Sequence, residues 1–80
     1  MITKTDIERW LKEAPKNATH MVVVCDTFDY EDYPVYVTEG QDVHRVKSAY
    51  SGNMQRVMEV YNLKKNIKEQ LSQTGRVFNY

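Results

Sequence analysis

The sequence has little of what several functional classes need. It contains one cysteine, three glycines and two prolines in 80 residues, and its eleven basic and eleven acidic residues cancel. A single cysteine argues against a small secreted fold held together by disulfides. Zero net charge argues against a general nucleic-acid-binding protein, which needs a surplus of cations to displace counterions. The spacings CxxC, HxxxH and HExxH are also absent, so we expect no metal site and no cofactor.

Long apolar runs are absent as well. The longest, Met21 to Cys25, has the length of a strand and is far from the roughly 20 residues of a membrane span. No signal peptide is visible at the start, so we expect a cytoplasmic protein without membrane contact. The length predicts one small domain over residues 1–80. A core of this size is marginal, so burial must be efficient or a homodimer must add to it.

Hydrophobic periodicity predicts six elements. Apolar residues spaced from Ile7 to Ala14, with Thr5 and Glu8 as a capping box, indicate a first helix that ends before Pro15. The apolar run Val22–Val24 indicates a central strand covered on both faces. The predicted helices cover residues 5–14, 42–50 and 63–73, and the predicted strands cover residues 19–28, 35–38 and 54–62.

This order, α-β-β-α-β-α, predicts an α+β fold with a mainly antiparallel three-stranded sheet packed by helices in two layers. Strict alternation in residues 54–62 puts Val57 and Tyr61 on one face, and Met58 and Val60 on the other. One long helix over residues 54–73 is the alternative, because that segment is rich in helix formers. We also expect a polar turn over residues 29–34, a helix cap at Gly75, and an apolar tail over residues 76–80 that packs on the body.

The cysteine and the two histidines do not form a recognisable catalytic set. Cys25 follows three valines and precedes Asp26, whose charge disfavours the thiolate, so we expect a core residue. No motif surrounds His20 or His44. Because no nucleophile, base and orienting group can be named together, we expect that the chain is not an enzyme. A small hydrolase with Asp26 or Glu31 as its base is the weakest hypothesis.

Residues 26–42 hold the first candidate binding surface. The segment carries six acidic residues and no basic one, whereas residues 43–80 carry seven basic and two acidic residues. Tyrosines alternate with the acids, and tyrosine suits both protein interfaces and stacking on nucleobases. We expect Phe28 and one or two tyrosines in the core and the rest exposed. A solvated acidic hairpin is the alternative. The candidate residues here are Asp29, Tyr30, Glu31, Asp32, Tyr33 and Tyr36.

The second candidate is the segment SGNMQR. Its small polar loop, residues 51–53, precedes a predicted strand that contains Arg56. Backbone donors and a planar guanidinium can hold an anion such as a phosphate. The candidate residues here are Asn53 and Arg56. A helix-capping turn beside a surface arginine is the alternative, because no known phosphate-binding motif is present.

Two long blocks, ATHMVVVCDTFDYEDYPVYV and NMQRVMEVYNL, resemble a family of small, uncharacterised tailed-phage accessory proteins. The opening IERWLKE and the ending EQLSQ with FNY extend this resemblance over nearly the whole chain. The resemblance assigns no activity to any residue. It implies expression from a phage gene in the cytoplasm of a bacterial host.

Two functions follow as hypotheses. The first is an inhibitor that binds a host or defence protein through the acidic, tyrosine-rich surface. The second is a protein that sequesters a nucleotide-type immune signal, a cyclic nucleotide or an ADP-ribose derivative, without catalysis. The first calls for a flat exposed surface around DYEDY, and the second calls for a pocket that combines Arg56 with tyrosines.

Overall fold

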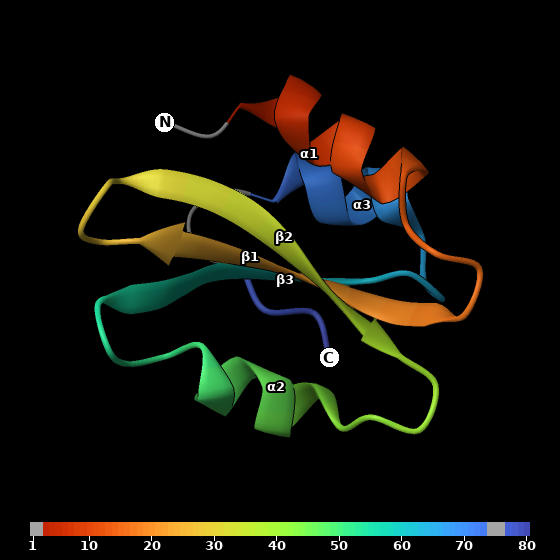
Figure 1. Cartoon of the computed structure of the whole chain (residues 1–80). Helices are drawn as coiled ribbons and strands as arrows, with labels where there is room; N and C mark the ends of the chain where they lie inside the picture. The colour runs from red at the N-terminus through yellow and green to blue at the C-terminus, as the bar shows by residue number, and fades with distance from the viewer. Residues whose placement is uncertain (1–2, 74–76) are drawn as a thin grey trace.

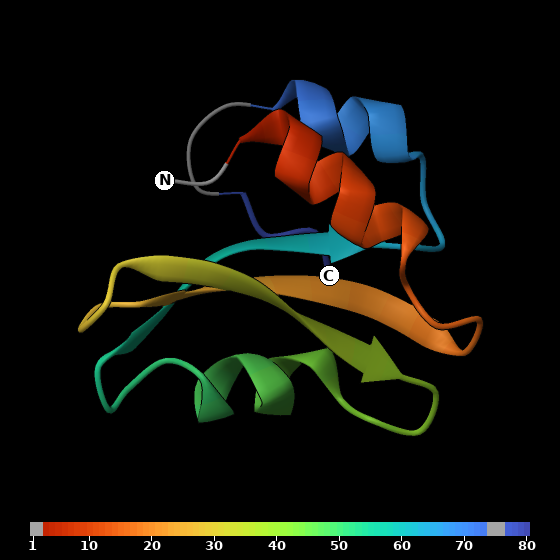
Figure 2. The same cartoon turned by 45° about the horizontal axis from the view of Figure 1, so that its top comes forward.

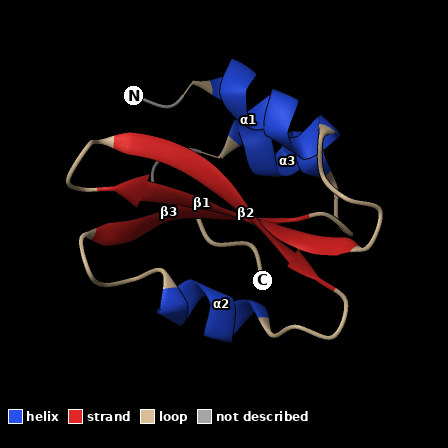
Figure 3. Ribbon diagram, viewed as in Figure 1, coloured by secondary structure: helices blue, strands red, loops and turns tan. Residues whose placement is uncertain are grey.

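The structure is a computed structural model, and it describes residues 3–73 and 77–80. The elements are α1 (Lys4–Lys12), β1 (Ala18–Asp26), β2 (Glu31–Thr38), α2 (Val43–Ala49), β3 (Gln55–Asn62) and α3 (Ile67–Ser72) (Figure 1). The three strands form one antiparallel sheet in the order β2-β1-β3 (Figure 3). The predicted α+β fold and element order are therefore confirmed, and residues 54–73 form a strand and a helix rather than one helix.

The central strand β1 divides the core in two. Val22 and Val24 pack toward α2, whereas Met21 and Val23 pack toward α1 and α3, and all four are fully buried. Figure 2 shows α1 and α3 on one side of the sheet and α2 on the other. The prediction of two layers is wrong: β1 is apolar on both faces, and each face needs its own cover.

A bulge in β3 changes which residues share a face. Glu59 lies opposite Val23 and Val57 lies opposite Val24, so Met58 is an extra residue in the ladder. Val57 and Val60 therefore both face α2, whereas Met58 and Tyr61 both face α1 and α3. The strict alternation predicted for this strand is wrong, because one inserted residue reverses every side chain beyond it.

The first hairpin turn is shorter than predicted. The turn covers residues 27–30, and β2 begins at Glu31, so residues 31–34 of the predicted polar turn belong to the strand. Asp26 sets this turn: its Oδ1 accepts the backbone N–H of Phe28 at 2.8 Å, and its carbonyl accepts that of Tyr30 at 2.7 Å. Pro34 lies on an edge strand, where the missing N–H is tolerated.

Two asparagines shorten the last helix. Asn62 Oδ1 accepts the N–H of Lys64 at 2.9 Å, and Asn66 Oδ1 accepts the N–H of Glu69 at 3.1 Å. These bonds form a turn and then an N-cap, so α3 begins at Ile67 rather than at residue 63. The predicted cap at Gly75 lies outside the described residues.

Residues 77–80 pack beside β3, as predicted for the tail. The backbone N–H of Val60 donates to the carbonyl of Val77 at 2.9 Å, and the backbone N–H of Asn79 donates to the carbonyl of Val60 at 2.9 Å. Phe78 packs against the α2 side of the core, and Lys47 Nζ lies 4.3 Å from the centre of its ring. The tail therefore satisfies backbone groups on the outer edge of β3.

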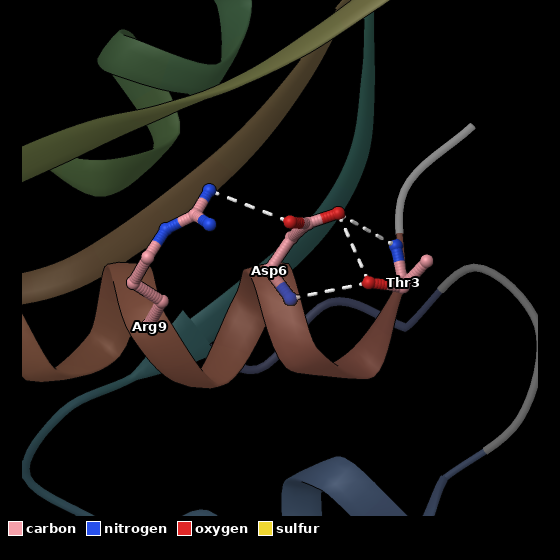
Figure 4. A network of polar contacts seen from close by, with 3 residues as sticks. All are labelled: Thr3, Asp6 and Arg9. Atoms are coloured by element: carbon pink, nitrogen blue, oxygen red, sulfur yellow. Dashed lines mark hydrogen bonds and ion pairs between the residues drawn. The ribbon is translucent and has the colours of Figure 1, made fainter.

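The first helix begins at a different threonine from the predicted one. Thr3, not Thr5, is the N-cap: its hydroxyl accepts the N–H of Asp6 at 3.2 Å, and Asp6 Oδ2 accepts the N–H of Thr3 at 3.3 Å (Figure 4). Arg9 pairs with the other carboxylate oxygen of Asp6 at 3.4 Å. The bonds from Thr3 hold the pKa of Asp6 below its usual value.

This difference is testable with two threonines of the same helix region. We expect Thr3→Ala to lower the free energy of unfolding by about 1 kcal/mol, because it removes an N-cap. Thr5→Ala is the matched control: Thr5 is exposed inside the helix, where alanine has the higher propensity, so stability should stay the same or rise. Urea denaturation measures both. A loss with Thr5→Ala alone would contradict the cap at Thr3.

Candidate functional site

Two loops meet at one end of the sheet. The turn 27–30 follows β1, the loop 51–54 precedes β3, and both lie at the left of Figure 1. The N–H of Thr27 donates to the carbonyl of Met54 at 2.8 Å, which joins the two loops. We call residues 28–31 together with Met54 the exposed tip.

The exposed tip carries apolar side chains that the core does not cover. Phe28 is 70% exposed, Tyr30 is 76% exposed and Met54 is 57% exposed. Within the described part of the chain, Tyr80 is the one other large apolar side chain with comparable exposure. The predicted burial of Phe28 is wrong, because the chain turns immediately after Asp26 and Phe28 lies beyond the end of the strand. Large exposed apolar patches are typical of interaction surfaces, so the exposed tip is a candidate binding surface.

The backbone of the two loops at this end of the sheet is unusual. Tyr30, Asn53 and Met54 have φ angles of 58°, 54° and 65°, and among the described non-glycine residues these are the ones with positive φ. Asparagine adopts this left-handed conformation readily, but tyrosine and methionine do not. Strained positions that keep a large side chain where glycine would fit better concentrate at functional sites.

The three predicted tyrosines do not lie together. Gln55 Nε2 donates to the hydroxyl of Tyr33 at 2.5 Å on the α2 side of the sheet. The hydroxyl of Tyr36 donates to the carbonyl of Trp10 at 2.6 Å on the opposite side. Burial raises the pKa of both phenols. These two tyrosines pack the sheet against its helices, and Tyr30 remains as the exposed one of the three.

Asp32 and Arg56 lie on either side of Cys25 rather than at the exposed tip. Cys25 pairs with Asp32 in β2 and with Arg56 in β3, so the three residues form a row across the sheet. Burial raises the pKa of the Cys25 thiol, Asp32 raises it further, and Arg56 acts in the opposite direction. The thiol is therefore protonated at neutral pH, which argues against a nucleophile. Cys25 is partly buried, short of the full burial expected for a core residue.

The two histidines meet at the tail. A ring nitrogen of His20 lies 3.3 Å from the carbonyl oxygen of Tyr80, and the rings of His44 and Tyr80 have centroids 4.3 Å apart. Both histidines thus contact the docked tail. Within residues 3–73 and 77–80, no three His, Cys, Asp or Glu side chains are grouped as metal ligands would be.

Arg56 lines a polar cleft of about 470 Å³ between α2 and β3, and Asn53 does not. Ser51 and Gln55 are among the other residues that line the cleft, while Asn53 is exposed in the adjoining loop. Lys47 and Met54 also line the cleft and were not among the predicted residues. A helix lysine and a loop methionine give no local signal, because only the tertiary structure brings them beside these loops.

Comparison with known proteins gives no match: no family model, no curated protein sequence and no solved structure is similar to this chain. No helix in the part of the chain that the structure describes has the length and apolar character needed to cross a membrane.

Proposed function

We propose that the chain is a binding protein that docks through its exposed tip onto a basic protein surface. The observation that carries this proposal is the exposure of Phe28 and Tyr30 on a short turn that also carries Asp29 and is followed at once by the exposed Glu31. Aromatic side chains that enter a partner's pocket supply most of the binding energy at protein interfaces. Acidic neighbours add a selection for cationic partners and a faster association.

The tip is also held in place before binding. Asp26 and the bond from Thr27 to Met54 fix both loops, so little conformational entropy is lost when a partner binds. The resemblance to tailed-phage accessory proteins implies that the partner is a host or defence protein. Many basic protein surfaces bind nucleic acid, so occupation by an acidic tip would inhibit that partner.

The test is capture from a bacterial lysate with the immobilised chain, followed by titration of each captured protein. We expect Phe28→Ser with Tyr30→Ser to weaken binding at least tenfold, roughly the effect of losing one interface anchor. The double variant Asp29→Asn with Glu31→Gln should weaken binding less, and this loss of affinity relative to the wild type should become smaller as the salt concentration rises. Isothermal calorimetry measures both effects.

The matched control for the neutralised pair is Glu13→Gln with Glu39→Gln, which changes the net charge equally at two exposed sites away from the tip. This control should bind like the wild type. If both tip variants captured the same proteins as the wild type with unchanged affinity, this surface would be ruled out as the docking site.

The polar cleft supports a second candidate, sequestration of a nucleotide-type signal. Its volume of about 470 Å³ lies within the range of small-ligand sites, and Lys47, Arg56 and Ser51 are among the residues that line it. Calorimetry with cyclic dinucleotides, cyclic trinucleotides and ADP-ribose derivatives tests it. Binding lost in Lys47→Ala and retained in the control Lys68→Ala would support the cleft. Absence of heat with every one of these ligands would reject it.

A further inference from the structure

A second surface lies between α1 and α3. A cleft of about 450 Å³ opens there, lined by Glu8, Leu11 and Lys12 of α1 and by Ile67, Lys68 and Leu71 of α3. Leu11, Ile67 and Leu71 make its apolar floor, and the two exposed lysines stand at its rim. Lys64 and Lys65 are also exposed, and they precede the start of α3, so two more cations lie near the end of the groove that Ile67 lines.

The groove and the exposed tip are complementary in chemistry. The tip presents two aromatic rings flanked by two carboxylates, and the groove presents three apolar side chains flanked by two ammonium groups and the single carboxylate of Glu8. If the tip entered the groove, the aromatic rings would be buried against apolar side chains, and the carboxylates of the tip would lie near the lysines. The groove is also of a size that holds small organic ligands, so an aromatic side chain can enter it.

The two surfaces cannot meet within one molecule. The last turn of α1 precedes the start of β1, whereas the exposed tip follows the end of β1. The nine residues of β1 therefore separate the groove from the tip by roughly 25–30 Å. Figure 2 places α1 and α3 over the part of the sheet away from the 27–30 turn. Contact between tip and groove therefore needs a second copy of the chain.

We infer that the exposed tip of one molecule docks into the α1–α3 groove of another. The contact joins two different surfaces, so it continues head to tail through further copies unless a ring closes. A single turn in a groove is a small interface, and small interfaces are transient. The inference rests on the proposed function only in taking the tip as a docking surface. A molecule whose tip is occupied in this way cannot bind a partner, so self-association would compete with partner binding.

The test uses two complementary variants of the full chain. The double variant Phe28→Ser with Tyr30→Ser removes the aromatic rings of the tip and leaves the groove unchanged. Lys12→Glu with Lys68→Glu reverses the groove rim and keeps the tip, and both lysines are exposed, so the fold should persist. Lys16→Glu with Arg45→Glu is the matched charge control at exposed sites elsewhere. Circular dichroism checks that each variant is folded.

Sedimentation equilibrium from about 10 μM to about 1 mM measures the average mass. We expect it to rise with concentration for the wild type and the charge control, to rise less at high salt, and to stay at one chain for each complementary variant alone. Mixing the two variants should give a dimer that grows no further, because one intact tip meets one intact groove. A wild type that stays monomeric, or a mixture without dimer, would overturn the inference.

The groove variant separates this inference from the proposed function. It should lose self-association and still bind any basic partner captured through the tip. Loss of partner binding in the tip variant with no self-association in the wild type would leave the proposed function standing and reject the head-to-tail contact.

Discussion

Replacing Gln70 with alanine should lower the free energy of unfolding by about 3 kcal/mol, because the buried N–H of Asn62 loses its acceptor and the Asn62 carbonyl keeps only the N–H of Lys65 at 3.2 Å. Gln70 Oε1 accepts the N–H of Asn62 at 2.7 Å, and Gln70 Nε2 donates to the carbonyl of the same residue at 2.8 Å. Both residues are buried, at 5% and 6% exposure. The side-chain amide thus pairs with the end of β3 as a neighbouring strand would and holds α3 to the sheet.

Urea denaturation measures this loss, and Lys68→Ala is the control because Lys68 is exposed on the same helix. The control should change stability by less than about 0.5 kcal/mol. Equal losses in the two variants would show that the amide does not hold α3.

Gln70→Glu gives the same contact a pH dependence. The protonated carboxyl can donate to the Asn62 carbonyl as the amide does, whereas the carboxylate cannot, so folding raises the pKa of the introduced group. The stability of this variant is then fully present below the unfolded pKa and is lost as pH rises through the raised folded pKa. Denaturation at about pH 4 should approach the wild type, and denaturation at about pH 7 should not.

Met21→Ala should cost about 3 kcal/mol, because it leaves a cavity in the part of the core under α1 and α3. Met21 is fully buried there and belongs to one cluster with Ile7, Val23 and Tyr61. The loss is large beside the roughly 4–12 kcal/mol expected for a chain of this length.

Met54→Ala is the matched control, since it makes the same substitution at a side chain that is 57% exposed. It should shift stability by no more than about 0.5 kcal/mol. If Met54→Ala matched the loss of Met21→Ala in thermal and urea unfolding, Met54 could not be free for docking.

Local sequence signals were sufficient where one residue type decides one local structure. The fully apolar run Val22–Val24 predicted a central strand, because only a strand covered on both faces buries every residue in turn. The same signals failed at the first cap, where Thr3 and Thr5 offer nearly the same pattern and the helix begins at the earlier one.

The candidate site was predicted only in part. Asp29, Tyr30 and Glu31 lie on the exposed tip, whereas Tyr33 and Tyr36 were separated by the pleat onto opposite faces. Asp32 follows the same alternation and lies beside Cys25. β1 ends two residues earlier than predicted and β2 begins four residues earlier than predicted. Phe28 therefore lies on the tip and not in the core.

By itself the sequence determined the element order, the central strand and the separation of charge between the hairpin and the C-terminal part. These depend on residues close together in the chain, which is the range over which periodicity and composition act. Only the tertiary structure decided that Met54 is joined to the 27–30 turn through Thr27, and that Leu11, Ile67 and Leu71 share one groove. Such neighbours are distant in sequence, and the bulge in β3 and the packing of helices on both sheet faces bring them together through contacts that no local pattern encodes.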